Sequence, residues 1–240
     1  MARKLKPEAP AQDLTKTALV LRTCSANMTA YNGFRWPESG RVEAPDWSPQ
    51  PHCGNGLHGL LWGVGNGELL SWADDAKWLV CEVPEHLLVE IDCKVKFPHC
   101  EVIYCGERGG AIDLLIARGA PQASMVCGTA TAGYAGTATA GTRGTATAGT
   151  RGTATAGYAG TATAGIRGTA TAGDAGTATA GDAGTATAGV KGTLVLRYWD
   201  ANADRVRLRV GYVGEDGIKV GVQYKLDAAH NFVAVEPEAK

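Results

Sequence analysis

Cys53 and His58 come nearest to a catalytic pair by residue type and spacing. They stand five residues apart in a glycine-rich segment, and an imidazole can activate a thiol as a nucleophile. The other interpretation is a buried thiol beside a histidine that hydrogen-bonds to the backbone of a turn. We favour this second interpretation and predict that the protein is not an enzyme. An unknown enzymatic activity in the N-terminal part stays as an alternative hypothesis.

The cysteines argue against a metal site. All seven precede residue 128, and an odd number in a chain without an evident signal peptide favours free thiols in a reducing compartment. Structural zinc sites need four ligands with tight Cys-x2-4-Cys spacing, whereas six and four residues separate Cys93, Cys100 and Cys105. We therefore expect no metal, no cofactor and a cytoplasmic location.

Threonine pairs supply the other candidate chemistry. Residues 128–191 contain eight identical copies of Gly-Thr-Ala-Thr-Ala-Gly, each followed by a variable pair. Alternation with period two suits an extended strand that carries threonine on one face and alanine on the other. Glycine at both ends of each strand predicts corners, because glycine adopts backbone conformations that other residues resist. The pattern predicts a β-solenoid.

The faces of these strands are assigned from the cost of burial. A buried hydroxyl without a partner costs about 1–3 kcal/mol, whereas an alanine methyl group has no such cost. We predict alanine inside and threonine outside; threonine inside is the alternative.

Two coil lengths fit the repeat. Sixteen residues give a thin two-sheeted coil that alanine can fill. Twenty-four residues give a triangular coil with a hollow centre, and cavities are destabilising. The variable pairs partly favour the longer coil, since Tyr134, Tyr158 and Asp182 each precede alanine at that spacing. We predict the sixteen-residue coil on packing volume.

Outward threonines would form a regular array of hydroxyl and methyl groups. Threonines of one strand would lie about 6.7 Å apart, and neighbouring coils about 4.7–4.9 Å apart. The predicted water- or ice-binding residues are Thr129, Thr131, Thr137, Thr139, Thr145, Thr147, Thr153, Thr155, Thr161, Thr163, Thr169, Thr171, Thr177, Thr179, Thr185 and Thr187.

The segment from Ala132 to Ala140 reads Ala-Gly-Tyr-Ala-Gly-Thr-Ala-Thr-Ala. It resembles the sixteen-residue coils of bacterial ice nucleation proteins, which contain Ala-Gly-Tyr-Gly-Ser-Thr-x-Thr-Ala, and the Thr-x-Thr arrays of β-solenoid antifreeze proteins. The resemblance implies ordering of interfacial water and binding to ice. Tyrosine occurs only in the pairs at 134 and 158, so the tyrosine ladder of that family is broken.

The flanking segments resemble an uncharacterised domain of bacterial and phage proteins, for which no activity is implied. The residues that carry this resemblance are Ala30–Phe34, Cys53–His58 and Val80–Val83, with a small β tail at Gln223–Asp227 and Asn231–Val235.

The remaining sequence predicts two capping regions around the solenoid. Residues 1–17 are expected to be flexible, residues 18–127 to form a small α+β domain, and residues 192–240 an antiparallel β-meander. Within the first domain we expect strands at 19–21, 79–83, 87–92 and 101–105, and a long loop at 33–67. A helix at 68–78 follows from the spacing of Leu69, Trp72, Ala73 and Ala76, and it would place Asp74 and Asp75 in its early part.

The composition limits the classes of partner that the protein can bind. The 23 basic and 24 acidic residues balance and form no basic run, which excludes a basic nucleic-acid binder. No stretch reaches the ~18 apolar residues of a membrane span. The fold class is thus mainly β, a short two-sheeted solenoid capped at both ends. We predict a non-enzymatic protein that orders water or binds ice weakly. The alternative is a structural spacer or assembly module, self-associating through solenoid edges or through Tyr134 and Tyr158.

Overall fold

The computed structural model describes residues 13–236, so most of the segment predicted to be flexible lies outside the described residues. The chain divides into two compact units. One contains residues 13–61 and 71–111, and the other contains residues 62–70 and 112–236. Helix α1 (Arg108–Ala117) spans the division. In the part described, no helix is long and apolar enough to cross a membrane.

The first unit is built on a seven-stranded antiparallel sheet in the order β2-β7-β4-β1-β3-β6-β5. Its central strands are buried on both faces, and its core includes Val20, Leu79 and Phe97. The strands are β1 (Thr17–Cys24), β2 (Gly40–Glu43), β3 (Leu57–Leu61), β4 (Lys77–Pro84), β5 (Val89–Ile91), β6 (Lys94–Phe97) and β7 (His99–Gly106).

Two local predictions for this unit are wrong. The predicted loop 33–67 contains β2 and β3. The predicted helix 68–78 is absent: a short 3-10 helix (Gly67–Leu69) is followed by extended backbone at Leu70, and β4 begins at Lys77. Other short 3-10 helices occur at Tyr31–Gly33 and Glu85–Leu87. Only Lys77 and Trp78 of the predicted helix belong to β4. Before them, Ser71 N donates to Thr23 Oγ1 at 2.7 Å, and the ring of Trp72 packs against that of Trp78. These tertiary contacts outweigh a weak local helix propensity.

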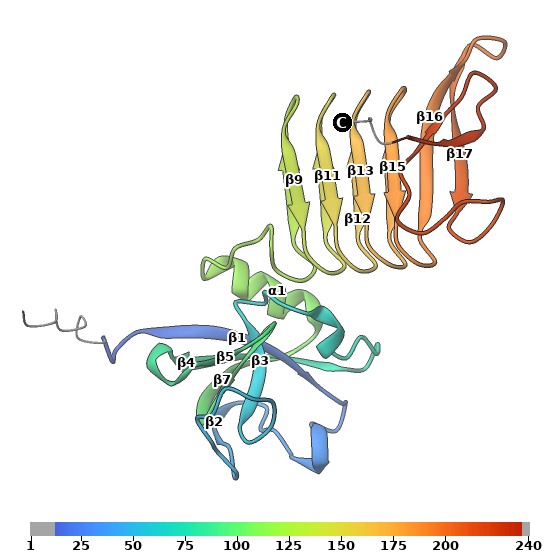
Figure 1. The fold of residues 1–240 in the computed structure, drawn as a ribbon. Helices are drawn as coiled ribbons and strands as arrows, with labels where there is room; N and C mark the ends of the chain where they lie inside the picture. Colours follow the sequence, from blue (N-terminus) through green and yellow to red (C-terminus); the bar gives the residue numbers. More distant parts are fainter. Residues whose placement is uncertain (1–12, 237–240) are drawn as a thin grey trace, which may run out of the picture. The chain divides into compact units, whose positions relative to one another are not determined.

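The solenoid confirms the predicted two-sheeted coil, in which two eight-residue repeats make one turn (Figure 1). Every strand of the repeats pairs in parallel and in register with the strand two repeats away, as Thr145 with Thr161 and Thr153 with Thr169. One sheet contains β8 (Thr129–Ala132), β10 (Thr145–Ala148), β12 (Thr161–Ala164) and β14 (Thr177–Ala180). The other contains β9 (Thr137–Ala140), β11 (Thr153–Ala156), β13 (Thr169–Ala172) and β15 (Thr185–Ala188).

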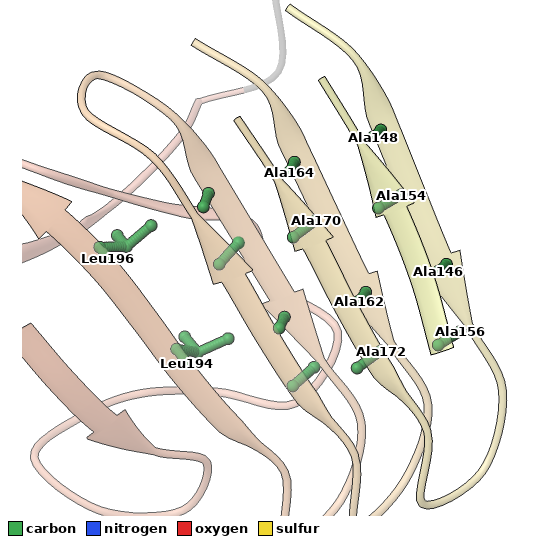
Figure 2. Packing of buried hydrophobic residues seen from close by; sticks show 14 of the residues in the cluster. Ala146, Ala148, Ala154, Ala156, Ala162, Ala164, Ala170, Ala172, Leu194 and Leu196 are labelled. Atoms are coloured by element: carbon green, nitrogen blue, oxygen red, sulfur yellow. The ribbon is translucent and has the colours of Figure 1, made fainter. Parts of the chain in front are cut away.

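Alanine side chains fill the space between the two sheets (Figure 2). Ala146, Ala154 and Ala162 are completely buried, and the threonines between them face outward. This arrangement confirms the predicted faces. Because a methyl group is small, the two sheets can approach closely and pack densely.

The C-terminal segment extends both sheets. Strand β16 (Thr193–Asp200) continues one sheet in parallel and pairs antiparallel with β17 (Arg205–Tyr212). Strand β18 (Tyr224–Leu226) pairs antiparallel with β15 and with β19 (Phe232–Ala234). The antiparallel pairing agrees with the prediction, but the strands are divided between two sheets instead of forming one meander. Leu194 and Leu196 replace the inward alanines and close this end of the core (Figure 2).

Candidate functional site

The outward threonines form two arrays, one on each sheet. We call the outer face of β8, β10, β12 and β14 the first threonine array, and that of β9, β11, β13 and β15 the second threonine array. Parallel in-register pairing stacks threonine on threonine through all coils of both sheets. Neighbouring hydroxyls therefore repeat at about 4.7–4.9 Å across the coils and about 6.7 Å along a strand.

The predicted threonines all lie on these two arrays, with side chains that are exposed or partly exposed. Those of the first two coils in the first array, such as Thr145 and Thr147, are exposed, whereas Thr177 and Thr179 near the C-terminal end are partly covered. The hydroxyls nearest the first coil are therefore the most accessible to solvent.

Two glutamines that the sequence did not single out terminate the arrays. Gln122 Nε2 donates to Thr129 Oγ1 at 2.9 Å, on the first coil of the first array. Gln223 Nε2 donates to Thr185 Oγ1 at 2.8 Å, on the last coil of the second array. In the second array Thr185 Oγ1 also donates to Thr169 Oγ1 at 3.2 Å. No sequence pattern marks these glutamines, because only the folded chain brings them to the ends of the arrays.

Tight corners join successive strands of the solenoid. The second residue of each variable pair, such as Ala135 and Arg151, has a φ of 50–60°. The corner glycines have another role than predicted. A Cβ on Gly149 would lie 2.8 Å from the backbone carbon of Gly133 in the preceding coil. Glycine is required there because two backbones approach closely, not because of its conformational freedom.

The variable pairs alternate between two edges of the solenoid. Ala135 N donates to Thr150 O and Arg143 N to Tyr158 O, so corners two repeats apart stack on one edge. Tyr134 and Tyr158, which are three repeats apart, consequently lie on opposite edges. The three-repeat pattern of the variable pairs therefore does not follow the coil, in which corners two repeats apart stack.

The Cys53 thiol accepts a hydrogen bond from Lys94 Nζ at 3.0 Å. His58 lies on β3 directly opposite Lys96 of β6. Burial, followed by the positive charges of Lys94, Lys96 and Arg22, lowers the pKa of His58 to about 4. The Cys53 thiol thus pairs with an ammonium group and not with an imidazole. Of the interpretation that we favoured, His58 lies in a strand where we predicted a turn, and Cys53 is exposed where we predicted a buried thiol.

Asp74 and Asp75 lie in a turn, where Ala76 N donates to Ala73 O at 3.1 Å, because the predicted helix is absent. Trp72, which precedes this turn, packs edge-on against Trp78, with ring centroids 5.2 Å apart. All seven cysteines are free, and within residues 13–236 no group of three or more His, Cys, Asp or Glu side chains could hold a metal ion.

Comparison with known proteins shows similarity to bacterial ice nucleation proteins. The chain is 44% identical over 116 residues to an ice nucleation protein of Pseudomonas syringae pv. syringae, which covers 48% of this chain and 10% of that protein. It is 44% identical over 103 residues to an ice nucleation protein of Pseudomonas fluorescens, and this match covers 42% of this chain and 8% of that protein. An ice nucleation protein of Xanthomonas campestris pv. translucens is 42% identical over 106 residues, and this match covers 43% of this chain and 7% of that protein. The matched stretch thus spans a tenth or less of these relatives.

The other comparisons concern the first unit and the fold. Residues 18–113 match a domain of unknown function (DUF7666), whereas no solved structure matches the chain. The chain is a β-solenoid repeat protein similar to bacterial ice nucleation proteins, with a domain of unknown function in its N-terminal part.

Proposed function

We propose that the two threonine arrays order interfacial water and bind ice weakly. The observation that carries the proposal is the in-register stacking of Thr-x-Thr pairs on both sheets. Each strand is held by parallel neighbours and by a tight corner at each end. The hydroxyls are therefore preorganised, and the threonine side chains lose less conformational entropy on binding water than groups on a mobile surface would.

The similarity to ice nucleation proteins supports this proposal, and the small number of coils limits it. Four strands in each array present a short surface, while the matched stretch makes up 10% or less of the relatives. A small array orders a small patch of water, so we propose weak activity in place of efficient nucleation.

Droplet freezing and thermal hysteresis test the proposal. We expect the purified chain to raise the freezing temperature of droplets above that of buffer and to shape growing ice crystals. Thr147→Lys with Thr163→Lys should abolish both effects of the first array, because two long charged side chains interrupt neighbouring coils. Thr155→Lys with Thr171→Lys tests the second array in the same way.

Thr150→Lys with Ile166→Lys is the matched control. Both residues are exposed at corners of neighbouring coils, off both arrays, so the same two added charges there should leave ice shaping and freezing unaltered. The proposal fails if the wild-type chain shows no hysteresis, no ice shaping and no change in freezing temperature.

The first coil favours a second function, in which the protein acts as an assembly module. Strands β8 and β9 stand last in the orders of their sheets, so no described strand pairs with their outer edges. Unpaired strand edges are templates for pairing with another chain. Sedimentation velocity over a range of concentrations tests this function, because self-association through edges should increase the mean mass with concentration.

A further inference from the structure

The loop before β3 brings a cysteine to the lysines of β6. Lys94 and Lys96 alternate with Val95 along β6, so their side chains share one face of the sheet. Cys53 is exposed and lies over this face, where its Sγ accepts a hydrogen bond of 3.0 Å from Lys94 Nζ. A thiol with an ammonium group at this distance is an ion pair once the thiol loses its proton.

Lys96 fixes the loop that carries Cys53. Its side chain is completely buried, and its Nζ donates to the carbonyl oxygens of His52 at 3.1 Å and Gly54 at 3.3 Å. The Nζ also lies 5.7 Å from the ring centroid of Trp47. A buried ammonium group is costly unless it is hydrogen-bonded, so these contacts hold the carbonyl groups of the two residues on either side of Cys53. The thiol is therefore positioned by the fold and not by an unconstrained loop.

The other cysteines differ from Cys53 in their surroundings. The hydrogen bond from Lys94 lowers the pKa of Cys53, and the charge of Lys96 acts in the same direction. Burial raises the pKa of Cys24 and Cys105, and the thiol of Cys81 with burial raises that of Cys100. Because the thiolate is the nucleophile, Cys53 has both the accessibility and the charge partner that a reactive thiol requires.

We propose that Cys53 is a modification site for hydroperoxides, with Lys94 as the residue that stabilises its thiolate. The thiolate sulfur attacks one oxygen of the hydroperoxide, an S–O bond forms and the O–O bond breaks. Sulfur is oxidised to sulfenic acid, R–S⁻ + H₂O₂ → R–SOH + OH⁻. The leaving hydroxide takes a proton from the Lys94 ammonium group to give water, and the lysine regains that proton from solvent. This site is independent of the threonine arrays.

The test uses the whole chain and hydrogen peroxide. Sulfenic acid is trapped with dimedone as it forms, and the rate of labelling is measured at each of the seven cysteines by peptide mass spectrometry. Cys93 is the internal control, since it is also exposed and stands next to Lys94 in the sequence. We expect Cys53 to be labelled about fivefold faster than Cys93 near neutral pH, because thiolate content determines the rate.

Lys94→Met removes the ammonium group and keeps the length of the side chain. We expect it to slow labelling of Cys53 about fivefold, with the rate of Cys93 unchanged, and Lys94→Arg to restore most of the rate. If the methionine variant fails to fold, the pH dependence in the wild-type chain decides. Labelling of Cys53 should reach half of its maximum at lower pH than that of Cys105, whose pKa is raised by burial. Equal rates at Cys53 and Cys93 together with equal pH dependence at Cys53 and Cys105, or an unchanged ratio in folded Lys94→Met, would overturn the proposal.

Discussion

At the scale of single residues, the structure distinguishes two reasons why glycine can be required at a corner of the solenoid. The left-handed backbone of each corner belongs to non-glycine residues such as Ala159 and Lys191. From the third repeat onward, the glycines beside them lie against the backbone of the preceding coil, where a Cβ has no room. The sequence indicates where the corners are, but it cannot distinguish conformational need from close contact, since the preceding coil lies two repeats away in the chain.

Gly149→Ala should therefore destabilise the solenoid. The new Cβ would lie 2.8 Å from the carbonyl carbon of Gly133, and overpacking of this kind costs about 1–3 kcal/mol. Urea unfolding followed by circular dichroism measures the change. Gly133→Ala is the matched control, because Gly133 occupies the same place in the first repeat and a Cβ there meets nothing within 4 Å. Equal losses of stability in the two variants would contradict the steric explanation.

Single residues also show how much of each candidate site could be predicted from the sequence. Alternation with period two places every threonine of Thr145–Ala148 and its copies on the outer face, and the structure agrees. The partner of Cys53 could not be predicted, because Lys94 stands 41 residues away and reaches the thiol only through the pairing of β3 with β6. Local periodicity is visible in a sequence, whereas the register between distant strands is not.

At the scale of elements, strands with a repeated period were predictable and helix α1 was not. Helix α1 contains Gly109 and Gly110 in its first turn, and glycine is a poor helix former. A Cβ on Gly110 would lie 2.8 Å from Cζ of Tyr104, so glycine is required by the aromatic ring beside it. Tertiary contact thus explains the missed helix, and the contacts of Ser71 and Trp72 with neighbouring strands explain the helix wrongly predicted at 68–78.

The C-terminal strand β16 closes the alanine core, and this role is testable. Leu194→Ala should cost about 2–5 kcal/mol, the usual loss for a buried leucine, because Leu194 is fully buried at the end of the core. Leu208→Ala on the paired strand β17 serves as control. Leu208 is 58% exposed, so its loss should change stability by less than about 0.5 kcal/mol. Chemical denaturation of both variants gives the comparison, and a stable Leu194→Ala chain would show that β16 does not close the core.

At the scale of the whole molecule, the size of the arrays follows from the number of repeats. Each pair of repeats adds one strand to each sheet, as β10 and β11 do. The core is made only of alanine within the repeats, so a new coil meets the same surroundings as an old one. Stability then grows by nearest-neighbour contacts along the solenoid.

Insertion of two further repeats after Arg167 should raise the droplet freezing temperature, because the ordered patch of water becomes larger. The added coil should fold without loss of stability, which thermal unfolding monitors. An insertion of the same length with lysine in place of its outward threonines is the control, and it should leave freezing at the wild-type temperature or lower. The same freezing temperature for both insertions would contradict a role of the threonines.

The eight repeats also make the two halves of each coil alike, since each half has the same Gly-Thr-Ala-Thr-Ala-Gly sequence. Successive strands are then related by a half-turn about the solenoid axis, combined with an advance of about 2.4 Å, half of the strand spacing. Gain or loss of a single repeat would keep every local contact of the core and rotate β16–β19 by that half-turn relative to β8. The number of repeats therefore sets both the length of the solenoid and the direction in which its C-terminal end faces.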